Sequence, residues 1–320
     1  KRVKRILPAY LVVLLAVLSV GGVIMPPEAL YQLSKEAASA LFQVTNVTSL
    51  SKAPYFSVSS IEKPLLHTWS LAVEWQFYLM VAAVLWLANK AWFKPNVIAL
   101  LILGLGSFFC SIFFAVSPGW ESHAYYNFIS RFWEFAVGAL TAYACFFSQS
   151  KYLRTATYLG ACCIAISFIV IDEAVAFPGY WALLPVLGTA GVIYGSQQES
   201  FIKALLASRV LVFVGKISYS LYLWHWPVFA FWRYITNHRE LGAYEVCLSL
   251  LCTLLLSLWS YSYIENMGRD KPVIKFTKLT FFIIFILCLA LIVSRGGGKF
   301  QERNEDYFET EIGCGTNADN

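Results

Sequence analysis

The sequence predicts an all-α fold, a polytopic helical bundle embedded in a membrane. Of its 320 residues, 58% are hydrophobic and only 13% are charged, whereas a soluble globular domain carries about 25% charged residues. The mean hydropathy is +0.62. The chain contains 11 Trp and 18 Tyr, two residue types that suit membrane–water interfaces. No basic stripe is interleaved with aromatic residues on a polar surface, so the expected partner is the lipid bilayer and not nucleic acid.

Nine apolar runs are expected to cross the bilayer, for which a helix needs about 20 residues. Proline and glycine residues, which cannot continue a helix, lie near several of the expected ends, as at Pro26-Pro27 and Pro178-Gly179. The predicted spans are 6–25, 66–88, 97–117, 128–148, 155–171, 180–195, 211–235, 244–264 and 277–294.

The placement of Lys and Arg predicts the orientation, because cytoplasmic segments carry an excess of both. With the first residue in the cytoplasm, fifteen of the 24 basic residues fall on that side and eight on the other, and Arg131 lies inside a span. The expected topology has a cytoplasmic N-terminus and an extracytoplasmic C-terminal tail. Residues 26–65 then form an outer loop, which contains the glycosylation sequon Asn46-Val47-Thr48.

The chain is expected to hold one membrane domain, residues 1–295, followed by an extracytoplasmic linker, residues 296–320. The linker begins with a flexible Gly-Gly-Gly joint and continues with polar residues. A start at Lys1 and a polar, acidic end predict a piece of a longer polypeptide. The eight cysteines include no CxxC pair, and no HExxH spacing occurs, so no metal site is expected.

The run LLHTWSLAVEWQFYLM, residues 65–80, carries two ionisable residues, His67 and Glu74. A charged side chain inside a membrane helix costs about 2.5–3.5 kcal/mol on insertion scales. Together with Ser70 and Tyr78 these residues follow spacings of three, four and four, which places them on one helix face. Lipid cannot satisfy such a face, so we expect it to line the bundle interior or a wet cavity.

A second polar pair lies in RFWEF, where Arg131 and Glu134 are three residues apart and can be neighbours on one helix face. One interpretation is an internal ion pair that locks helix packing. The other is an anion-binding arginine that its glutamate holds in place. The sequence leaves both interpretations open.

A third polar set lies in ISYSLYLWHWP, residues 217–227, where Ser218, Tyr222 and His225 share a helix face. A single histidine on an apolar face is usually a satisfied core residue. The two other polar stripes favour a functional role for His225.

The chain starts with the basic cluster KRVKR, at the expected cytoplasmic mouth of the first span. Such a cluster is a topology signal. Arg2 and Arg5 are in addition candidates for binding phosphate groups, because a guanidinium matches phosphate oxygens bidentately. Both interpretations stay open.

These polar residues favour group transfer over transport alone. A histidine beside a carboxylate can take a proton from a hydroxyl, and the carboxylate orients the ring. An arginine can bind a phosphate or a developing negative charge. The sequence contains no P-loop, no GxSxG elbow and no GxGxxG.

Five segments together resemble the integral-membrane acyltransferase 3 family. LLHTWSLAVEWQFYL, RFWEFAVGAL and ISYSLYLWHWPV match its internal motifs, and KRVKRILPAYL is similar to its RRxxRILPAL segment. YSYIENMGRDKP is similar to the family's closing E-x-P-x-R element, although Asn266-Met267 departs from it. The resemblance covers the chain from Lys1 to about Arg295.

The resemblance implies an enzyme of the bacterial inner membrane that transfers an acyl group, usually acetyl, from cytoplasmic acetyl-CoA to a cell-envelope glycan. Lipopolysaccharide O-antigen is one such acceptor. Acetyl-CoA is then a substrate, and no permanently bound cofactor is expected. The GGGKF segment is similar to the linker of members with a fused periplasmic SGNH domain, which would follow Asn320.

The resemblance also implies roles for the polar residues. The family's central catalytic histidine lies in a first helix that would precede Lys1, so His67, Glu74 and His225 are expected to be supporting catalytic residues. Arg131, Glu134 and Tyr222 are expected to bind substrate. The coenzyme A phosphates are assigned to Arg2 and Arg5.

Two other functions fit the same residues. Proton-coupled transporters and flippases also place His, Glu and Arg inside the membrane, but they commonly show inverted repeats, and the sequence shows no repeat. A non-catalytic scaffold for glycan assembly would tolerate the loss of Glu74 and His225 while folding normally.

Overall fold

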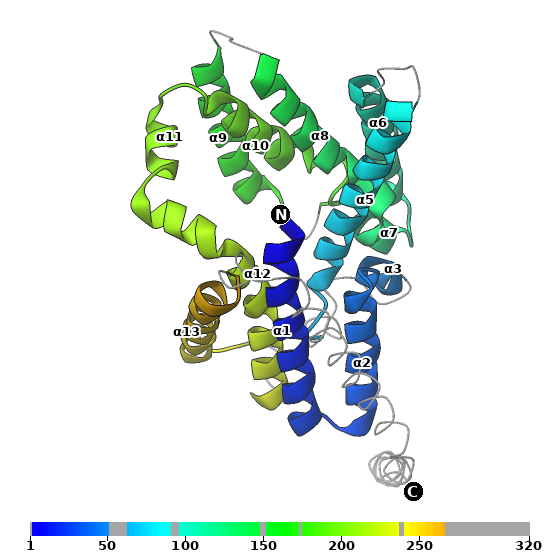
Figure 1. Cartoon of the computed structure of the whole chain (residues 1–320), viewed down its shortest axis with the longest axis vertical. Helices are drawn as coiled ribbons and strands as arrows, with labels where there is room; N and C mark the ends of the chain where they lie inside the picture. Colours follow the sequence, from blue (N-terminus) through cyan, green and yellow to red (C-terminus); the bar gives the residue numbers. More distant parts are fainter. Residues whose placement is uncertain are drawn as a thin grey trace, which may run out of the picture. The chain divides into compact units, whose positions relative to one another are not determined.

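The computed structural model describes residues 2–50, 63–90, 96–147, 152–172, 175–236 and 240–265. Every regular element in these ranges is helical, which confirms the predicted all-α class. The helices, labelled in Figure 1, form two compact units. One of the boundaries between them falls inside one long helix, between Tyr219 and Ser220.

The first unit combines the N-terminal helices with the last described ones. It contains α1 (Arg2–Ile24), α2 (Pro27–Leu41), the part of α12 (Arg209–Thr236) from Ser220 onward, α13 (Ala243–Ser260) and the π-helix η1 (Tyr261–Glu265). The helix α1 packs against α2 and η1. The Tyr10 hydroxyl donates a hydrogen bond to the Ala40 carbonyl at 2.8 Å, and the Trp226 indole N–H donates to the Lys63 carbonyl at 2.7 Å.

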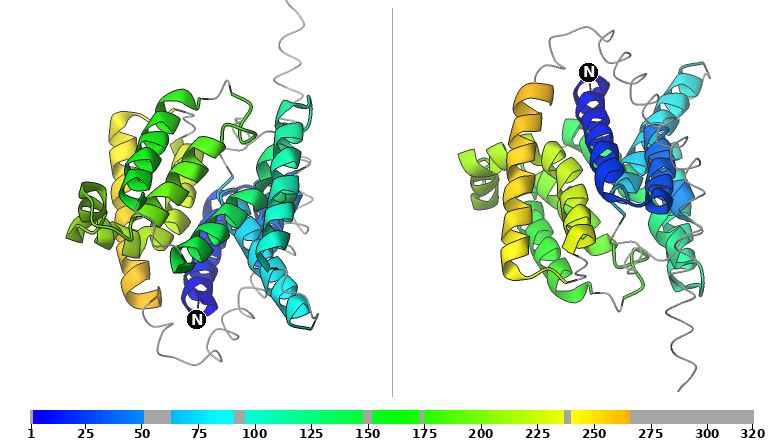
Figure 2. Two further views of the ribbon diagram at one scale, coloured as in Figure 1. Left: turned by 90° about the horizontal axis from the view of Figure 1, so that it is seen from above. Right: turned by 90° about the horizontal axis from the view of Figure 1, so that it is seen from below.

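The second unit contains α3 and the helices from α5 to the first part of α12. Its most extensive contacts join α9 to α10, which lie side by side in Figures 1 and 2, and α6 to α8. The bounds are α3 Thr45–Ser49, α5 Thr68–Lys90, α6 Asn96–Val116, α7 Glu121–Tyr126, α8 Phe128–Phe147, α9 Leu153–Val170, α10 Leu183–Gly195 and α11 Phe201–Leu206.

The predicted spans agree closely with the helices. Each of the first eight coincides, within a few residues at either end, with one of α1, α5, α6, α8, α9, α10, α12 and α13. The ninth, 277–294, lies outside the described residues, so the count of nine stays a prediction. By length and composition, four described helical stretches can cross a membrane, namely 6–24, 97–116, 153–170 and 243–265.

The expectation of a loop over residues 26–65 is wrong for two stretches, which form α2 and α3. Helix α2 begins with Pro27 at its first position, where a missing N–H costs nothing. Its apolar residues recur every three or four positions, and Leu33, Ala37 and Ala40 are buried. The sequence therefore contained the signal for an amphipathic helix.

Phenylalanine side chains and one serine connect α8 to its neighbours. Phe77 of α5 packs against Phe132 of α8, with ring centroids 5.5 Å apart. The Ser107 hydroxyl of α6 donates to the Ile129 carbonyl at 2.5 Å and accepts a hydrogen bond from the backbone N–H of Trp133 at 2.9 Å. These contacts hold the first turn of α8 in a defined position.

A pair of side-chain amides ties α3 to α5. Gln76 Nε2 donates to Asn46 Oδ1 at 2.8 Å, and Asn46 Nδ2 donates to Gln76 Oε1 at 3.2 Å. Asn46 Nδ2 also lies 3.2 Å from the Tyr126 carbonyl, at the end of α7. Asn46, the sequon asparagine, is only 1% exposed, so in the folded chain its amide serves packing.

Replacing Gln76 with leucine is expected to destabilise the second unit by about 1–3 kcal/mol, because it leaves the buried Asn46 amide without its reciprocal partner. The measurement is the thermal unfolding midpoint of the purified protein in detergent. Gln197→Leu is the control, since Gln197 is exposed and bonds only within its own turn, to the Tyr194 carbonyl. Equal midpoints for the two variants would contradict the prediction.

Candidate functional site

Arg131 and Glu134 form an ion pair on one face of α8, as their spacing allows. Arg131 Nη1 lies 2.8 Å from Glu134 Oε1, and the two side chains are 15% and 21% exposed. Arg131 lies in the first turn of α8, next to the short helix α7. The pair is therefore located near one end of this predicted span.

Three aromatic rings surround the Arg131 guanidinium. Its central carbon lies 5.6 Å from the Trp69 ring centroid, 5.5 Å from that of Tyr125 and 5.9 Å from that of Phe177. Each distance is within cation–π range. The rings come from α5, α7 and the segment before α10, so the arginine joins three elements of the second unit.

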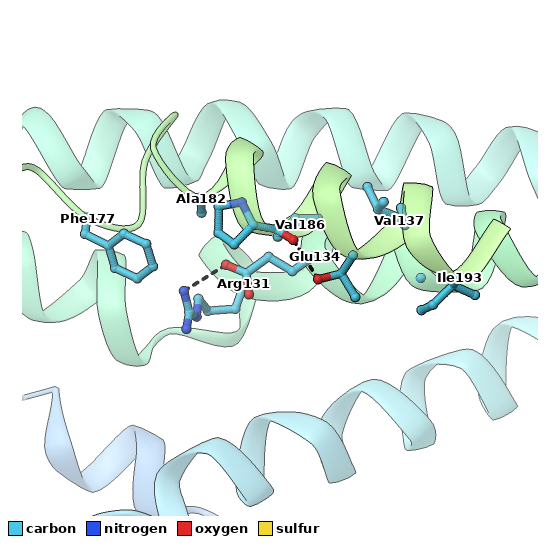
Figure 3. Close-up of a pocket in the computed structure, with 11 residues that line it drawn as sticks. Arg131, Glu134, Val137, Phe177, Ala182, Val186 and Ile193 are labelled. Atoms are coloured by element: carbon cyan, nitrogen blue, oxygen red, sulfur yellow. Dashed lines mark hydrogen bonds and ion pairs between the residues drawn. The ribbon is translucent and has the colours of Figure 1, made fainter. Parts of the chain in front are cut away.

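A cavity of about 330 Å³ adjoins the ion pair, between α8 and α10. Figure 3 shows the Arg131–Glu134 ion pair next to the α10 residues that form the opposite wall. The lining residues are Arg131, Glu134, Val137, Gly138, Phe177, Ala182, Pro185, Val186, Thr189, Ala190 and Ile193.

The charge at this cavity is balanced, because one cation and one anion face each other. The pair offers guanidinium N–H donors beside carboxylate acceptors. Burial raises the pKa of the neighbouring Tyr125 phenol, while the positive charge of Arg131 opposes the rise. Tyr125 therefore stays protonated at neutral pH.

The raised pKa of Tyr125 predicts a loss of stability in alkaline solution. In the unfolded chain this phenol ionises near its usual value of 10.0, whereas in the folded chain it stays protonated to higher pH. The contribution of this phenol to the free energy of unfolding is present below about pH 10. It is lost as the pH rises from the pKa of the unfolded chain to that of the folded chain. Tyr125→Phe is expected to weaken the decline of the melting temperature above about pH 10. The exposed Tyr143→Phe is the control, and equal declines in both would contradict the prediction.

The first predicted polar stripe is present, with one correction. Helix α5 begins at Thr68, so His67 lies in the turn before the helix and not on it. His67 is 1% exposed. Glu74 is half-buried in α5 and accepts a hydrogen bond from the Tyr78 hydroxyl one turn later. The α5 ring that contacts Arg131 is that of Trp69, next to this stripe.

Two members of the third predicted set, Tyr222 and His225, lie in the first unit, whereas Ser218 is exposed and belongs to the second unit. His225 is half-buried on α12, and its Nδ1 lies 2.6 Å from the Tyr222 carbonyl. The Tyr222 and His225 ring centroids are 5.4 Å apart. Helix α12 continues through Pro227. Tyr222 and His225 therefore form a local pair, as their spacing predicts.

The predicted phosphate-binding residues Arg2 and Arg5 lie in the first turns of α1. Their side chains are outside the described part of the structure, so the assignment stays a prediction. Helix α1 also contacts η1, which carries Glu265. Glu265 is 1% exposed and accepts a hydrogen bond from the Ser220 hydroxyl at 2.5 Å.

The sequence prediction missed Trp69, Tyr125 and Phe177 as site residues. Trp69 looks like an ordinary member of an apolar run. Tyr125 and Phe177 lie in segments that connect the predicted spans, where nothing in their spacing relates them to Arg131. The wall from α10 was missed for the same reason, because only folding brings Val186 and Ile193 opposite α8.

The fold and the polar sites together define a multi-pass helical membrane protein with ionisable groups in its interior. The acyltransferase 3 family pattern, described as an acyltransferase domain, matches residues 1–262. The chain therefore belongs to this family of membrane acyltransferases.

Several curated relatives are similar over most of the chain. O-acetyltransferase OatA of Staphylococcus aureus strain MRSA252 is 30% identical, over 92% of this chain and 52% of its own length. OatA of strain NCTC 8325 is 29% identical over the same shares. A putative O-acetyltransferase of strain COL is 27% identical, over 92% of this chain and 51% of its own length. The chain spans about half the length of these relatives, and no solved structure matches it.

Proposed function

We propose that the protein is a membrane O-acetyltransferase, which moves an acetyl group from cytoplasmic acetyl-CoA to a hydroxyl of an extracytoplasmic cell-envelope glycan. Membership of the acyltransferase family and the names of the relatives support this reaction. The family resemblance implies the bacterial inner membrane as the location, and the distribution of basic residues favours a cytoplasmic N-terminus. A fused SGNH domain beyond Asn320 belongs to the same proposal.

The observation that carries the proposal is the Arg131–Glu134 pair under its three aromatic rings. A sugar hydroxyl both donates and accepts hydrogen bonds, and the pair offers a donor beside an acceptor. Phe177, which lines the cavity, provides apolar surface for the ring of a sugar. With the N-terminus in the cytoplasm, the first turn of α8 lies near the outer surface, where a glycan is available.

The balanced charge of this site supports its role as the acceptor site. An arginine already neutralised by a carboxylate at 2.8 Å is a weak site for the anionic phosphates of coenzyme A. Arg2 and Arg5, at the other end of the predicted topology, are the better candidates for the donor. Arg131 is therefore proposed to bind the acceptor and not the donor.

The proposed step breaks the thioester C–S bond of acetyl-CoA and forms an ester C–O bond to the sugar. The hydroxyl proton passes to a base and finally to the leaving thiolate, which becomes free coenzyme A. A histidine suits this task near neutral pH. The family resemblance implies that this base is a histidine that neither His67 nor His225 matches, so these two and Glu74 are proposed to support it. Tyr222 is proposed to contact substrate.

The test compares the surface glycans of cells that carry, lack or regain the complete gene, by mass spectrometry and NMR of O-acetyl groups. We expect the O-acetyl signals to disappear on deletion and to return with the intact gene, but not with a Glu74→Gln version expressed at the same level. Unchanged acetylation with a glycan stalled on the inner side would instead indicate a carrier.

A further inference from the structure

The cavity beside Arg131 is longer than an acetyl group or a hydroxyl requires. Its lining runs from Arg131 to Gly138 along α8, and from Ala182, the residue just before α10, to Ile193 of α10. At 1.5 Å of rise per residue, these stretches correspond to roughly 10 and 16 Å. The cavity is therefore a slot that follows the two helices, and Figure 3 shows its walls.

The slot changes in character along its length. The end near the first turn of α8 holds the Arg131–Glu134 pair, and the remainder is lined by Val137, Val186 and other apolar or small side chains. Thr189 offers no free donor to the slot, because its hydroxyl donates to the Pro185 carbonyl at 2.7 Å within its own helix. Such a slot fits a ligand with a polar head and an unbranched apolar tail.

The slot is open along one side. Gly138 on α8 and Ile193 on α10 both line it and are exposed, Ile193 to 48%. Both helices coincide with predicted membrane spans, so this side is expected to face the hydrocarbon of the bilayer. A chain can then enter sideways without leaving the lipid.

The direction of the slot matches that of a lipid in a bilayer. Its polar end lies at the end of a predicted span, and its apolar part extends toward the middle of α8. A membrane lipid likewise keeps its polar group at the interface and its chain in the interior.

We propose that the acceptor reaches this site as a glycolipid, with its sugar at the Arg131–Glu134 pair and one hydrocarbon chain in the slot between α8 and α10. This inference rests on the proposed transfer to a sugar hydroxyl. It adds that the sugar is attached to a lipid. The slot would then select acceptors that have a hydrocarbon chain.

The chain offers a matched pair of variants for a test. Gly138 lines the slot, and a Cβ added there would meet nothing within 4 Å, so we expect a leucine at this position to narrow the slot without displacing the backbone. A Cβ added at Gly106 on α6 would likewise meet nothing within 4 Å, but Gly106 does not line the slot. Gly138→Leu is therefore the test variant and Gly106→Leu the control, both in the complete gene product reconstituted in nanodiscs.

The binding probe is a dodecyl glucoside with a photoreactive diazirine at the end of its chain. After irradiation, peptide mass spectrometry should find adducts concentrated on slot residues of α8 and α10 in the wild type and in Gly106→Leu. We expect about fivefold fewer of these adducts in Gly138→Leu. Adducts spread evenly over all exposed helix faces, and insensitive to Gly138→Leu, would show ordinary lipid contact and overturn the inference.

The kinetic arm compares methyl glucoside with dodecyl glucoside as acetyl acceptors, with acetyl-CoA as donor. The long chain is expected to lower the acceptor KM about tenfold. Gly138→Leu should remove this advantage, whereas the control Gly106→Leu should keep it. Equal KM values for both glucosides would overturn the proposal that the slot binds a lipid chain. The proposed acetyl transfer would still stand. Slot labelling without transfer to either glucoside would instead count against the proposed function.

Discussion

Replacing Arg131 with alanine is expected to reduce kcat/KM for acyl transfer by about 10²-fold, since loss of a positioning group costs this much even when the chemistry is distant. A 10²-fold loss corresponds to about 2.7 kcal/mol of transition-state stabilisation. The guanidinium holds Glu134 at 2.8 Å and lies between three aromatic rings, so its removal affects both the acceptor contacts and the shape of the pocket.

The split between the two substrates distinguishes this role from a structural one. For Arg131→Ala the KM of the acceptor should rise, whereas the KM of acetyl-CoA should stay unchanged. Arg131→Lys keeps the charge but loses the planar fork and the stacking, so we expect it to recover only part of the activity. Arg154→Ala, which removes an exposed arginine from α9, is the control. Full activity of Arg131→Ala at normal expression would remove this residue from the site.

Replacing Gly160 with leucine is expected to prevent correct folding of the second unit. A Cβ at this position would lie 2.5 Å from the Gly188 carbonyl oxygen and 2.8 Å from the Val192 nitrogen. Both are backbone atoms of α10, which cannot move without separating the two helices. Small residues allow such close approach between membrane helices, and a large one removes it.

The yield of monodisperse protein after detergent extraction measures this effect, together with its melting temperature. Gly160→Leu should give little folded protein, whereas the size-matched Gly106→Leu on α6 should give a normal yield, because nothing lies within 4 Å of its added Cβ. Two variants of equal yield and melting temperature would refute the α9–α10 contact. Gly160→Ala should lower the yield and the melting temperature too, but less than Gly160→Leu does.

The sequence predicted long helices well because the property that selects them is local. An apolar run such as residues 97–117 is helical in a membrane regardless of its neighbours, since every backbone group must be satisfied within the segment. Short helices were missed where composition was mixed. Helix α2 had a clear period, but its polar residues led to its assignment as part of a loop.

The candidate site was predictable only in part, for a similar reason. Arg131 and Glu134 are three residues apart on one helix, so their contact follows from helical geometry. The rings of Tyr125 and Phe177 and the wall of α10 come from distant segments, and only tertiary packing relates them to the arginine. The glycine contacts between α9 and α10 belong to the same class of non-local information.

The open side of the slot also determines which concentration of the acceptor controls the rate of the reaction. A ligand that enters between α8 and α10 from the surrounding lipid searches in two dimensions, so the rate of encounter depends on its mole fraction in the membrane. Adding inert lipid at constant bulk concentration should then slow the reaction by surface dilution. A water-soluble acceptor would show no such dependence, and the thickness and fluidity of the bilayer would be irrelevant to its capture.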